Sequence, residues 1–200
     1  MTVFLTFVSM AFALLVGLIV ALAQFDKRKW YFRWPARAFV EIIRGTPLLL
    51  QLFYIFYVFP FFGLRLDRLV AAVLGLGINT GAYLSEVFRA GIDAVDKGQW
   101  EAADALGMPT SLTLRHVVLP QAFRIVVPPT GNYFISLFKD TALVSTISVS
   151  ELLFSGQLLA AQSFRYIEIY SLIFVIYLAI SFPASLGVRW IERRLRISSR

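Results

Sequence analysis

The chain has 200 residues and no cysteine, which excludes a disulfide framework and a thiolate metal site. With 58% hydrophobic residues, 16% aromatic residues and a mean hydropathy of +0.74, it carries more apolar surface than a soluble domain of this size could bury, so we expect an integral, all-α membrane protein. The net charge is +7, but the basic residues cluster beside apolar runs, which argues against a nucleic-acid partner.

Residues 3–25 form the first apolar run and contain no charged side chain. About 20 helical residues cross a hydrocarbon core of ~30 Å, so this run is long enough to be the first transmembrane helix. A cleaved secretory signal is the alternative. A signal has a basic start and a shorter apolar core, whereas here the basic cluster follows the run, so the sequence favours a permanent span.

Residues 26–44 are strongly basic and interleave their lysines and arginines with aromatic residues. This mixture is typical of an interfacial segment whose rings sit among lipid headgroups, and its place between two apolar runs makes RNA binding a poor alternative. Gly45 and Pro47 then predict a bend before the next apolar run, residues 48–64. We expect that run to be the second span.

Residues 69–88 are the expected third span and contain several small residues. Gly77 and Gly81 have the GxxxG spacing that lets helix backbones approach closely in lipid. Glu86 and Arg89 are three residues apart and can pair on one face of the helix, near its cytoplasmic end. We interpret them as a local ion pair.

The longest polar interval, residues 99–120, is predicted to form two short helices joined at a corner, the first over residues 100–106. Gly107 can take the left-handed conformation that ends a helix. Thr110 or Ser111 can cap the second helix, and the proline at position 120 delimits it. From periodicity alone, an ordinary amphipathic loop on the membrane surface is the alternative.

Residues 121–138 contain an arginine, two adjacent prolines and an asparagine, which makes a poor free-standing transmembrane helix. Such a helix is stable only where its neighbours satisfy its backbone or where it lines a cavity. We expect a broken fourth span here, followed over residues 142–162 by a short returning helix. Residues 167–191 are the expected fifth span, with a kink at Pro183.

The distribution of positive charge predicts how the spans are oriented. Of the 19 lysines and arginines, all but Arg65, Arg68, Lys139 and Arg165 lie in residues 26–44, 89–124 and 189–200. By the positive-inside rule these three stretches are cytoplasmic. A single transmembrane domain over residues 1–200, with about five spans, an external N-terminus and a cytoplasmic C-terminus, satisfies this rule and places the loop at about 93–120 in the cytoplasm.

The polar loop also carries a motif. It consists of Glu101, Ala102, Ala103 and Gly107, followed after nine residues by Val117, Leu119 and Pro120. This spacing resembles the EAA loop of permeases of bacterial ATP-binding-cassette (ABC) importers, with valine at position 117 where that family usually carries isoleucine. Four pieces of the chain resemble the polar amino-acid branch of the type I importer permeases: residues 44–51, 83–107, 117–124 and 132–152.

The resemblance implies a permease subunit that moves a polar amino acid inward by alternating access, as a multi-pass protein of the bacterial inner membrane. An ectoine-like compatible solute is the alternative substrate. The implied partners are cytoplasmic ABC ATPase subunits, a second permease subunit (identical or homologous), an extracytoplasmic solute-binding protein and the lipid membrane.

The resemblance also implies that the polar loop is the coupling helix that docks on the ATPase. Its coupling residues would be Glu101, Ala102, Ala103, Gly107, Leu119 and Pro120. The chain has no GxxxxGK[ST] motif, so we expect neither an ATPase site of its own nor a cofactor.

Polar residues within the spans are costly in lipid and are therefore candidates for the substrate path. The candidates are Asn79, Tyr83, Asn132, Ser136, Lys139, Asp140 and Thr141. Lys139 could meet a substrate carboxylate and Asp140 a substrate ammonium. Alternatively, these two residues lie at the outer interface and hold the break in the helix.

Two other classes of membrane protein fit the sequence less well. A secondary transporter usually shows repeats within a longer chain, and we find no internal repeat here. An intramembrane enzyme needs a catalytic constellation, but the lone histidine, His116, lies in the polar loop. We therefore expect a transport subunit without enzymatic activity.

Overall fold

The computed structural model describes residues 1–25 and 30–197, and every element in these residues is helical. The α-helices are α1 (Thr2–Phe25), α2 (Trp30–Arg44), α3 (Leu48–Phe53), α4 (Arg68–Asp93), α5 (Lys97–Ala105), α6 (Thr110–Thr113), α7 (Leu119–Asp140), α8 (Leu152–Ser163) and α9 (Tyr166–Ile197). They are supplemented by the π-helical turns η1 (Tyr54–Val58) and η3 (Leu114–Val118) and the 3-10 turns η2 (Phe59–Phe62) and η4 (Thr141–Ile147).

Within these residues, three helices, α1, α4 and α9, are long and apolar enough to cross a membrane, and the number rises to five if each of two bent helix pairs is one span. The all-α membrane fold predicted from the sequence is therefore confirmed.

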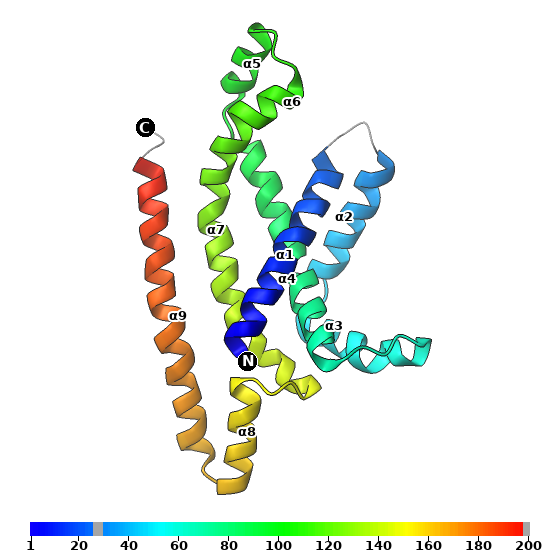
Figure 1. The fold of residues 1–200 in the computed structure, drawn as a ribbon, viewed down its shortest axis with the longest axis vertical. Coiled ribbons are helices and arrows are strands. Elements are labelled where there is room, and N and C mark those ends of the chain that lie inside the picture. The colour runs from blue at the N-terminus through cyan, green and yellow to red at the C-terminus, as the bar shows by residue number, and fades with distance from the viewer. Residues whose placement is uncertain (26–29, 198–200) are drawn as a thin grey trace.

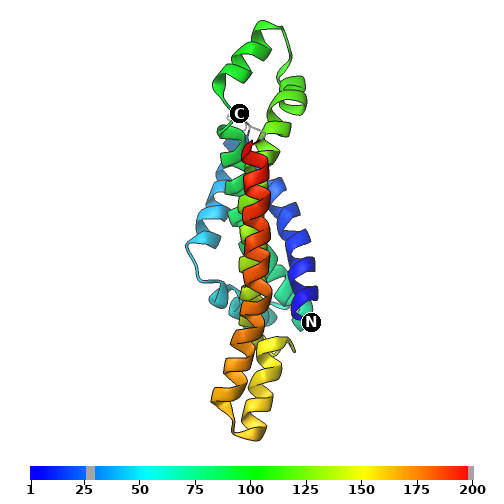
Figure 2. The same ribbon diagram turned by 90° about the vertical axis from the view of Figure 1, so that its left-hand side faces the viewer.

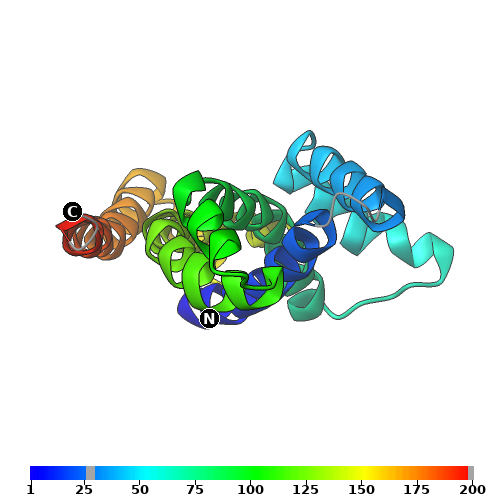
Figure 3. The ribbon, with the colours of Figure 1, turned by 90° about the horizontal axis from the view of Figure 1, so that it is seen from above.

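The long helices lie side by side in the order α9, α7, α4, α1 and α2 (Figures 1 and 3). Helices α5 and α6 extend beyond this layer at one end, whereas α8 and the start of α9 extend beyond it at the other (Figure 2). The end of α9 lies toward the end of the layer that carries α5 and α6, and the N-terminus lies toward the opposite end.

The closest helix contact joins α1 and α4 through small residues. A β-carbon built at Gly81 of α4 would lie 2.8 Å from the Cβ atom of Val16, and one built at Gly77 would collide with Phe12. Gly17 of α1 faces α4 in the same way, because its β-carbon would lie 2.9 Å from that of Leu84. The predicted role of the GxxxG spacing is confirmed, since the backbones approach where only glycine fits.

The apolar core lies on the N-terminal side of this contact, where five elements meet. Its fully buried members include Leu5, Leu52, Leu76, Leu137 and Val144, from α1, α3, α4, α7 and η4. The core therefore fixes the short segments η4 and α3 against the long helices.

The bend predicted at Gly45 and Pro47 is confirmed: α2 runs antiparallel beside α1, and the chain from Leu48 to Phe62 bends away from it by 104° (Figure 1). The second span differs from the expected one, because the segment from Leu48 to Phe62 is long and apolar enough to cross a membrane only when it is counted together with α2. The bend arises because Pro47 disfavours a helical conformation at Thr46, whose hydroxyl instead donates to the carbonyl of Ile42 at 2.9 Å. Part of the expected interfacial segment, residues 26–29, lies outside the described residues.

The fourth span is broken, as predicted, but α8 does not return. It is bent by only 51° from the preceding segment and therefore extends further outward (Figure 1). Glu151 begins α8 by accepting the backbone N–H groups of Leu153 and Phe154 at 2.8 and 2.7 Å. The chain reverses only after α8, where Phe164 has a φ of +57°, so the returning helix is α9.

The predicted ion pair at the end of α4 is confirmed. The guanidinium of Arg89 donates to Glu86 at 2.6 Å and to Asp93 at 3.0 Å. These contacts span the last turns of α4, directly before the chain leaves the layer for α5. They therefore stiffen the helix end that carries the polar loop.

We expect Gly81→Val to loosen the contact between α1 and α4. Its side chain would push Val16 and the backbone of Ala13 away, and overpacking of this kind costs about 1–3 kcal/mol. Thermal unfolding in detergent should show a lower midpoint than for wild type. Gly187→Val is the matched control, because a β-carbon at Gly187 meets no atom within 4 Å. Equal midpoints for the two variants would contradict the close contact.

Candidate functional site

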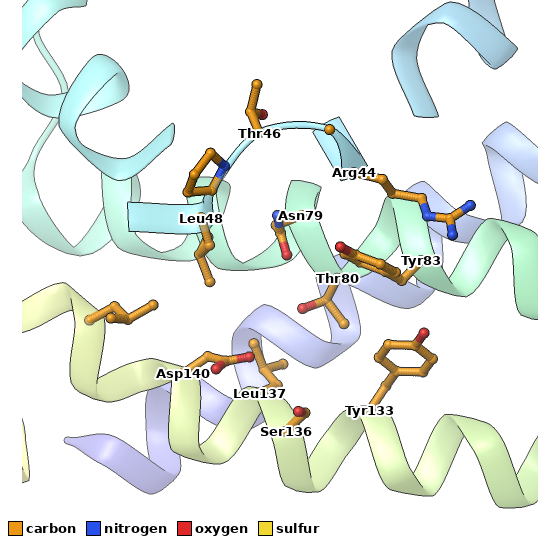
Figure 4. A pocket seen from close by; sticks show the side chains of 13 residues that line it. Arg44, Thr46, Leu48, Asn79, Thr80, Tyr83, Tyr133, Ser136, Leu137 and Asp140 are labelled. Atoms are coloured by element: carbon orange, nitrogen blue, oxygen red, sulfur yellow. The ribbon is translucent and has the colours of Figure 1, made fainter. Parts of the chain in front are cut away.

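A cavity of about 520 Å³ opens where α2 breaks into α3, between α4 and α7 (Figure 4). Its lining residues are Arg44, Gly45, Thr46, Pro47, Leu48, Asn79, Thr80, Tyr83, Tyr133, Ser136, Leu137, Asp140 and Leu143. They come from the two irregular points of the fold, the break after α2 and the end of α7, and from the middle of α4. Such irregular backbone is tolerated within a span only where it is packed in protein or lines a cavity.

The cavity holds two opposite charges at opposite ends (Figure 4). The guanidinium of Arg44 lies 5.2 Å from the centre of the Tyr83 ring, and that ring stacks on Tyr133 at 5.7 Å. Asp140 lies in the last turn of α7. Among the described residues, neither Arg44 nor Asp140 forms an ion pair with the other or with a third residue. Both charges therefore remain available to a ligand.

Gln51 of α3 holds the break in place from behind the cavity. Its amide nitrogen donates to the carbonyls of Ile43 and Thr46 at 2.8 and 3.1 Å, and to the Thr46 hydroxyl at 2.8 Å. Its amide oxygen accepts a hydrogen bond from Asn79 of α4 at 3.1 Å. One side chain thus satisfies carbonyls that the end of α2 leaves unpaired and joins the break to α4.

The structure brings four of the seven candidate path residues to this cavity: Asn79, Tyr83, Ser136 and Asp140. The other three lie elsewhere. Asn132 and Lys139 are exposed and do not line it. Thr141 is fully buried, and its hydroxyl donates to the carbonyl of Phe138 at 2.7 Å.

Nine of the 13 lining residues were not among the candidates, and Arg44 and Tyr133 are the most informative of them. Arg44 was counted with the cytoplasmic charges, but it ends α2 at the break and lines the cavity. Tyr133 precedes Ser136 by three residues and Asp140 by seven, so helical periodicity along α7 could have identified it. No comparable pattern pointed to Arg44, because its place depends on the bend.

The polar loop forms the expected two-helix hairpin, although α5 starts at Lys97, earlier than expected. Asp96 caps α5 by accepting the N–H of Gly98 at 2.7 Å. Gly107 has a φ of +69°, which confirms the predicted left-handed helix end. Within the motif, Glu101 and Ala102 are exposed, whereas Ala103 is buried.

The second half of the hairpin differs from the prediction. Neither Thr110 nor Ser111 caps α6, because Pro109 occupies the N-cap position and provides no side-chain hydrogen bond. Pro120 does not end the helix either. The preceding turn is widened into η3, in which the N–H of Leu119 bonds to Leu114 five residues back, so Pro120 sits in the first turn of α7 and the chain continues as a helix.

The hairpin is attached firmly to the ends of α4 and α7. Val95, Val118 and Ala122 are buried together at its base, and Trp100 and Leu114 pack against them. The amide of Gln121 donates to Gln99 at 3.1 Å and to the carbonyl of Val117 at 2.9 Å. The two helices that carry the hairpin, α4 and α7, also carry most of the cavity side chains.

Comparison with known proteins adds independent findings. A family model described as "Binding-protein-dependent transport system inner membrane component" matches residues 13–197. The chain is 47% identical over 195 residues to the L-cystine transport system permease protein TcyB of Bacillus subtilis, with 97% of this chain and 83% of the relative covered. It is 39% identical over 199 residues to the glutamine transport system permease protein GlnP of Escherichia coli, with 98% of this chain and 90% of the relative covered.

One solved structure is also very similar. It is described as the crystal structure of an amino acid ABC transporter with histidines, and one of its chains matches with a TM-score of 0.93 and 38% sequence identity. The match covers 97% of this chain and 90% of that chain. Fold and sequence therefore agree along nearly the whole length.

Proposed function

Because the chain belongs to the family of binding-protein-dependent transport system inner membrane components, we propose that it is the membrane-spanning subunit of an ATP-driven importer for polar amino acids. The observation that carries this proposal is the cavity with Arg44 and Asp140 at opposite ends. A free amino acid carries a carboxylate and an ammonium, which match these two charges. The cystine and glutamine systems to which the chain is similar handle substrates of this kind.

In the cavity, Arg44 binds the substrate carboxylate and Asp140 binds the substrate ammonium. A guanidinium presents paired N–H donors that fit a carboxylate, and charge-assisted hydrogen bonds of this type are stronger than neutral ones. Arg44 takes the role that the sequence suggested for Lys139, because Arg44 lines the cavity and Lys139 does not. Asn79, Tyr83 and Ser136 supply further polar contacts.

The hairpin of α5 and α6 couples the cavity to a separate ATPase subunit. Glu101 lies in the middle of α5 with an exposed carboxylate that makes no hydrogen bond or ion pair with the described residues, so it can pair with a basic residue of a partner. Ala102 beside it is small and exposed, which allows another surface to approach closely. Movement of the hairpin reaches the cavity through α4 and α7, because both helices are continuous between the two sites.

The remaining partners follow from the same assignment. A second permease subunit, identical or homologous, completes the translocation path, and a solute-binding protein delivers substrate from the side of the N-terminus. Most side chains of α9 are exposed in the single chain, and only 6% of its most apolar stretch is buried, so this helix faces lipid or the second subunit. Leu119, at the start of α7, is likewise exposed near the hairpin.

The orientation can be tested by cysteine labelling in intact cells. Arg65→Cys lies on the loop before α4 and Gly98→Cys lies in α5, and the natural chain has no cysteine to interfere. A membrane-impermeant maleimide should label the cysteine at position 65 from outside and that at position 98 only after permeabilisation. The reverse pattern would invert the proposed topology.

The charge assignment predicts a loss of substrate binding for Arg44→Gln and Asp140→Asn. Removing one partner of a charge-assisted hydrogen bond costs about 1.5–3 kcal/mol, so affinity should fall by roughly tenfold to a hundredfold. Binding of radiolabelled L-glutamine or L-cystine to the purified complex measures the loss. Lys139→Gln is the control, and an effect of this control as large as that of Arg44→Gln would move the carboxylate site to Lys139.

The coupling role predicts that Gly107→Val and Glu101→Lys insert and fold normally but lose stimulation of the ATPase by liganded binding protein. A β-branched residue at a φ of +69° is strained by roughly 1–2 kcal/mol, which displaces the hairpin. Gly107→Asn is the matched control, because asparagine tolerates the left-handed region and should keep the stimulation. Wild-type stimulation in both test variants would show that the hairpin is a passive loop.

A further inference from the structure

Gln51 can adopt only one amide orientation in this structure. Two of its partners, the main-chain oxygens of Ile43 and Thr46, are carbonyls and can only accept hydrogen bonds. The NH2 group of Gln51 must therefore face the end of α2. Its amide oxygen consequently faces Asn79, 3.1 Å away, and accepts from it.

This orientation determines how Asn79 faces the cavity. Because the oxygen of Gln51 can only accept, Asn79 must turn its NH2 group toward Gln51. The oxygen of the same amide is then directed into the cavity, as Figure 4 shows. Gln51 itself does not line the cavity, so its effect on a ligand must pass through the lining residues that it binds, Asn79 and Thr46.

We propose that Gln51 is a positioning residue that makes Asn79 a fixed hydrogen-bond acceptor for the substrate ammonium, which Asn79 binds together with Asp140. Without Gln51, the Asn79 amide can rotate and present either its oxygen or its NH2 group. A fixed acceptor favours ligands that bring an N–H donor and disfavours those that lack one, because the partly buried oxygen of Asn79 then loses its partner. This role presupposes the amino-acid substrate of the proposed function.

A purely structural role of Gln51, holding the break between α2 and α3, makes a different prediction. If the geometry between α2 and α3 were lost, the cavity would change shape and the binding of every ligand would weaken alike. If only the orientation of Asn79 were lost, the binding of ligands with an ammonium group alone would weaken. Two probe pairs separate these effects: L-glutamine with glutaramic acid, and L-cystine with 3,3′-dithiodipropionic acid, in which the second member lacks the α-amino group.

The experiment is equilibrium binding to the purified complex of permease and ATPase, with the probe pair that wild type binds. We expect Gln51→Met to lower the affinity for the amino acid about tenfold and to leave the affinity for the desamino analogue unchanged. The ratio of the two affinities should therefore fall about tenfold. Asn79→Leu should do the same, and the double variant should lose no more than either alone. Gln162→Met, on the exposed face of α8, is the matched control and should keep wild-type discrimination.

A rescue variant keeps the test decisive. In Gln51→Met combined with Asn79→Asp, the carboxylate is an acceptor in every orientation and does not need Gln51, so discrimination should return. Parallel loss of both ligands in Gln51→Met, multiplicative losses in the double variant, or no rescue by Asn79→Asp would each overturn the positioning role. If wild type binds none of the probe amino acids, the proposed function itself fails instead.

Discussion

The contact between α1 and α4 determines most of the other geometry. In lipid, apolar helices gain nothing from leaving water, so their association depends on close packing, and glycine at positions 17, 77 and 81 allows the backbones to meet. The position of α4 in turn fixes the cavity residues Asn79 and Tyr83 at its middle and the Arg89 ion pairs at its end. The cavity and the hairpin of α5 and α6 therefore both depend on α4, and the position of α4 is set by glycines that do not line the cavity.

The cavity lies where two helical segments are interrupted, after α2 and at the end of α7. Each interruption frees backbone carbonyls from the helical pattern, and a side chain binds them: the amide of Gln51 at the first and the hydroxyl of Thr141 at the second. The side chains of Arg44 and Asp140 line the cavity and form no ion pair with the described residues. The backbone carbonyls at the two interruptions are thus hydrogen-bonded within the chain, whereas these two charges have no oppositely charged partner there.

Local signals in the sequence were sufficient for features that depend on neighbouring residues. The first span, the GxxxG contact, the pair of Glu86 and Arg89 and the left-handed Gly107 were all predictable from spacing and residue type. Features that depend on a bend were not. Charge counting does not show whether an arginine lines a cavity, whereas the turn after α2 places Arg44 at the cavity wall. Lys139 and Thr141 adjoin Asp140 in sequence, but a helix turns by about 100° per residue, so they face elsewhere.

The π-helical turn η3 relates the hairpin to the cavity in a further way. It lies between α6 and α7, and the cavity face of α7 begins at Tyr133, only a few turns later. A π-turn holds one extra residue locally, because the N–H of Leu119 bonds to the carbonyl of Leu114 five residues back. Removing that residue would restore an ordinary α-helical turn and leave α7 nearly in place, whereas a deletion between η3 and Tyr133 would rotate everything beyond it by about 100°, with a shift of about 1.5 Å. Such a deletion would turn Ser136 and Asp140 away from the cavity wall while the hairpin stayed in place. The helix between the two sites is thus constrained in its length, and η3 is the point where a change of one residue can be absorbed.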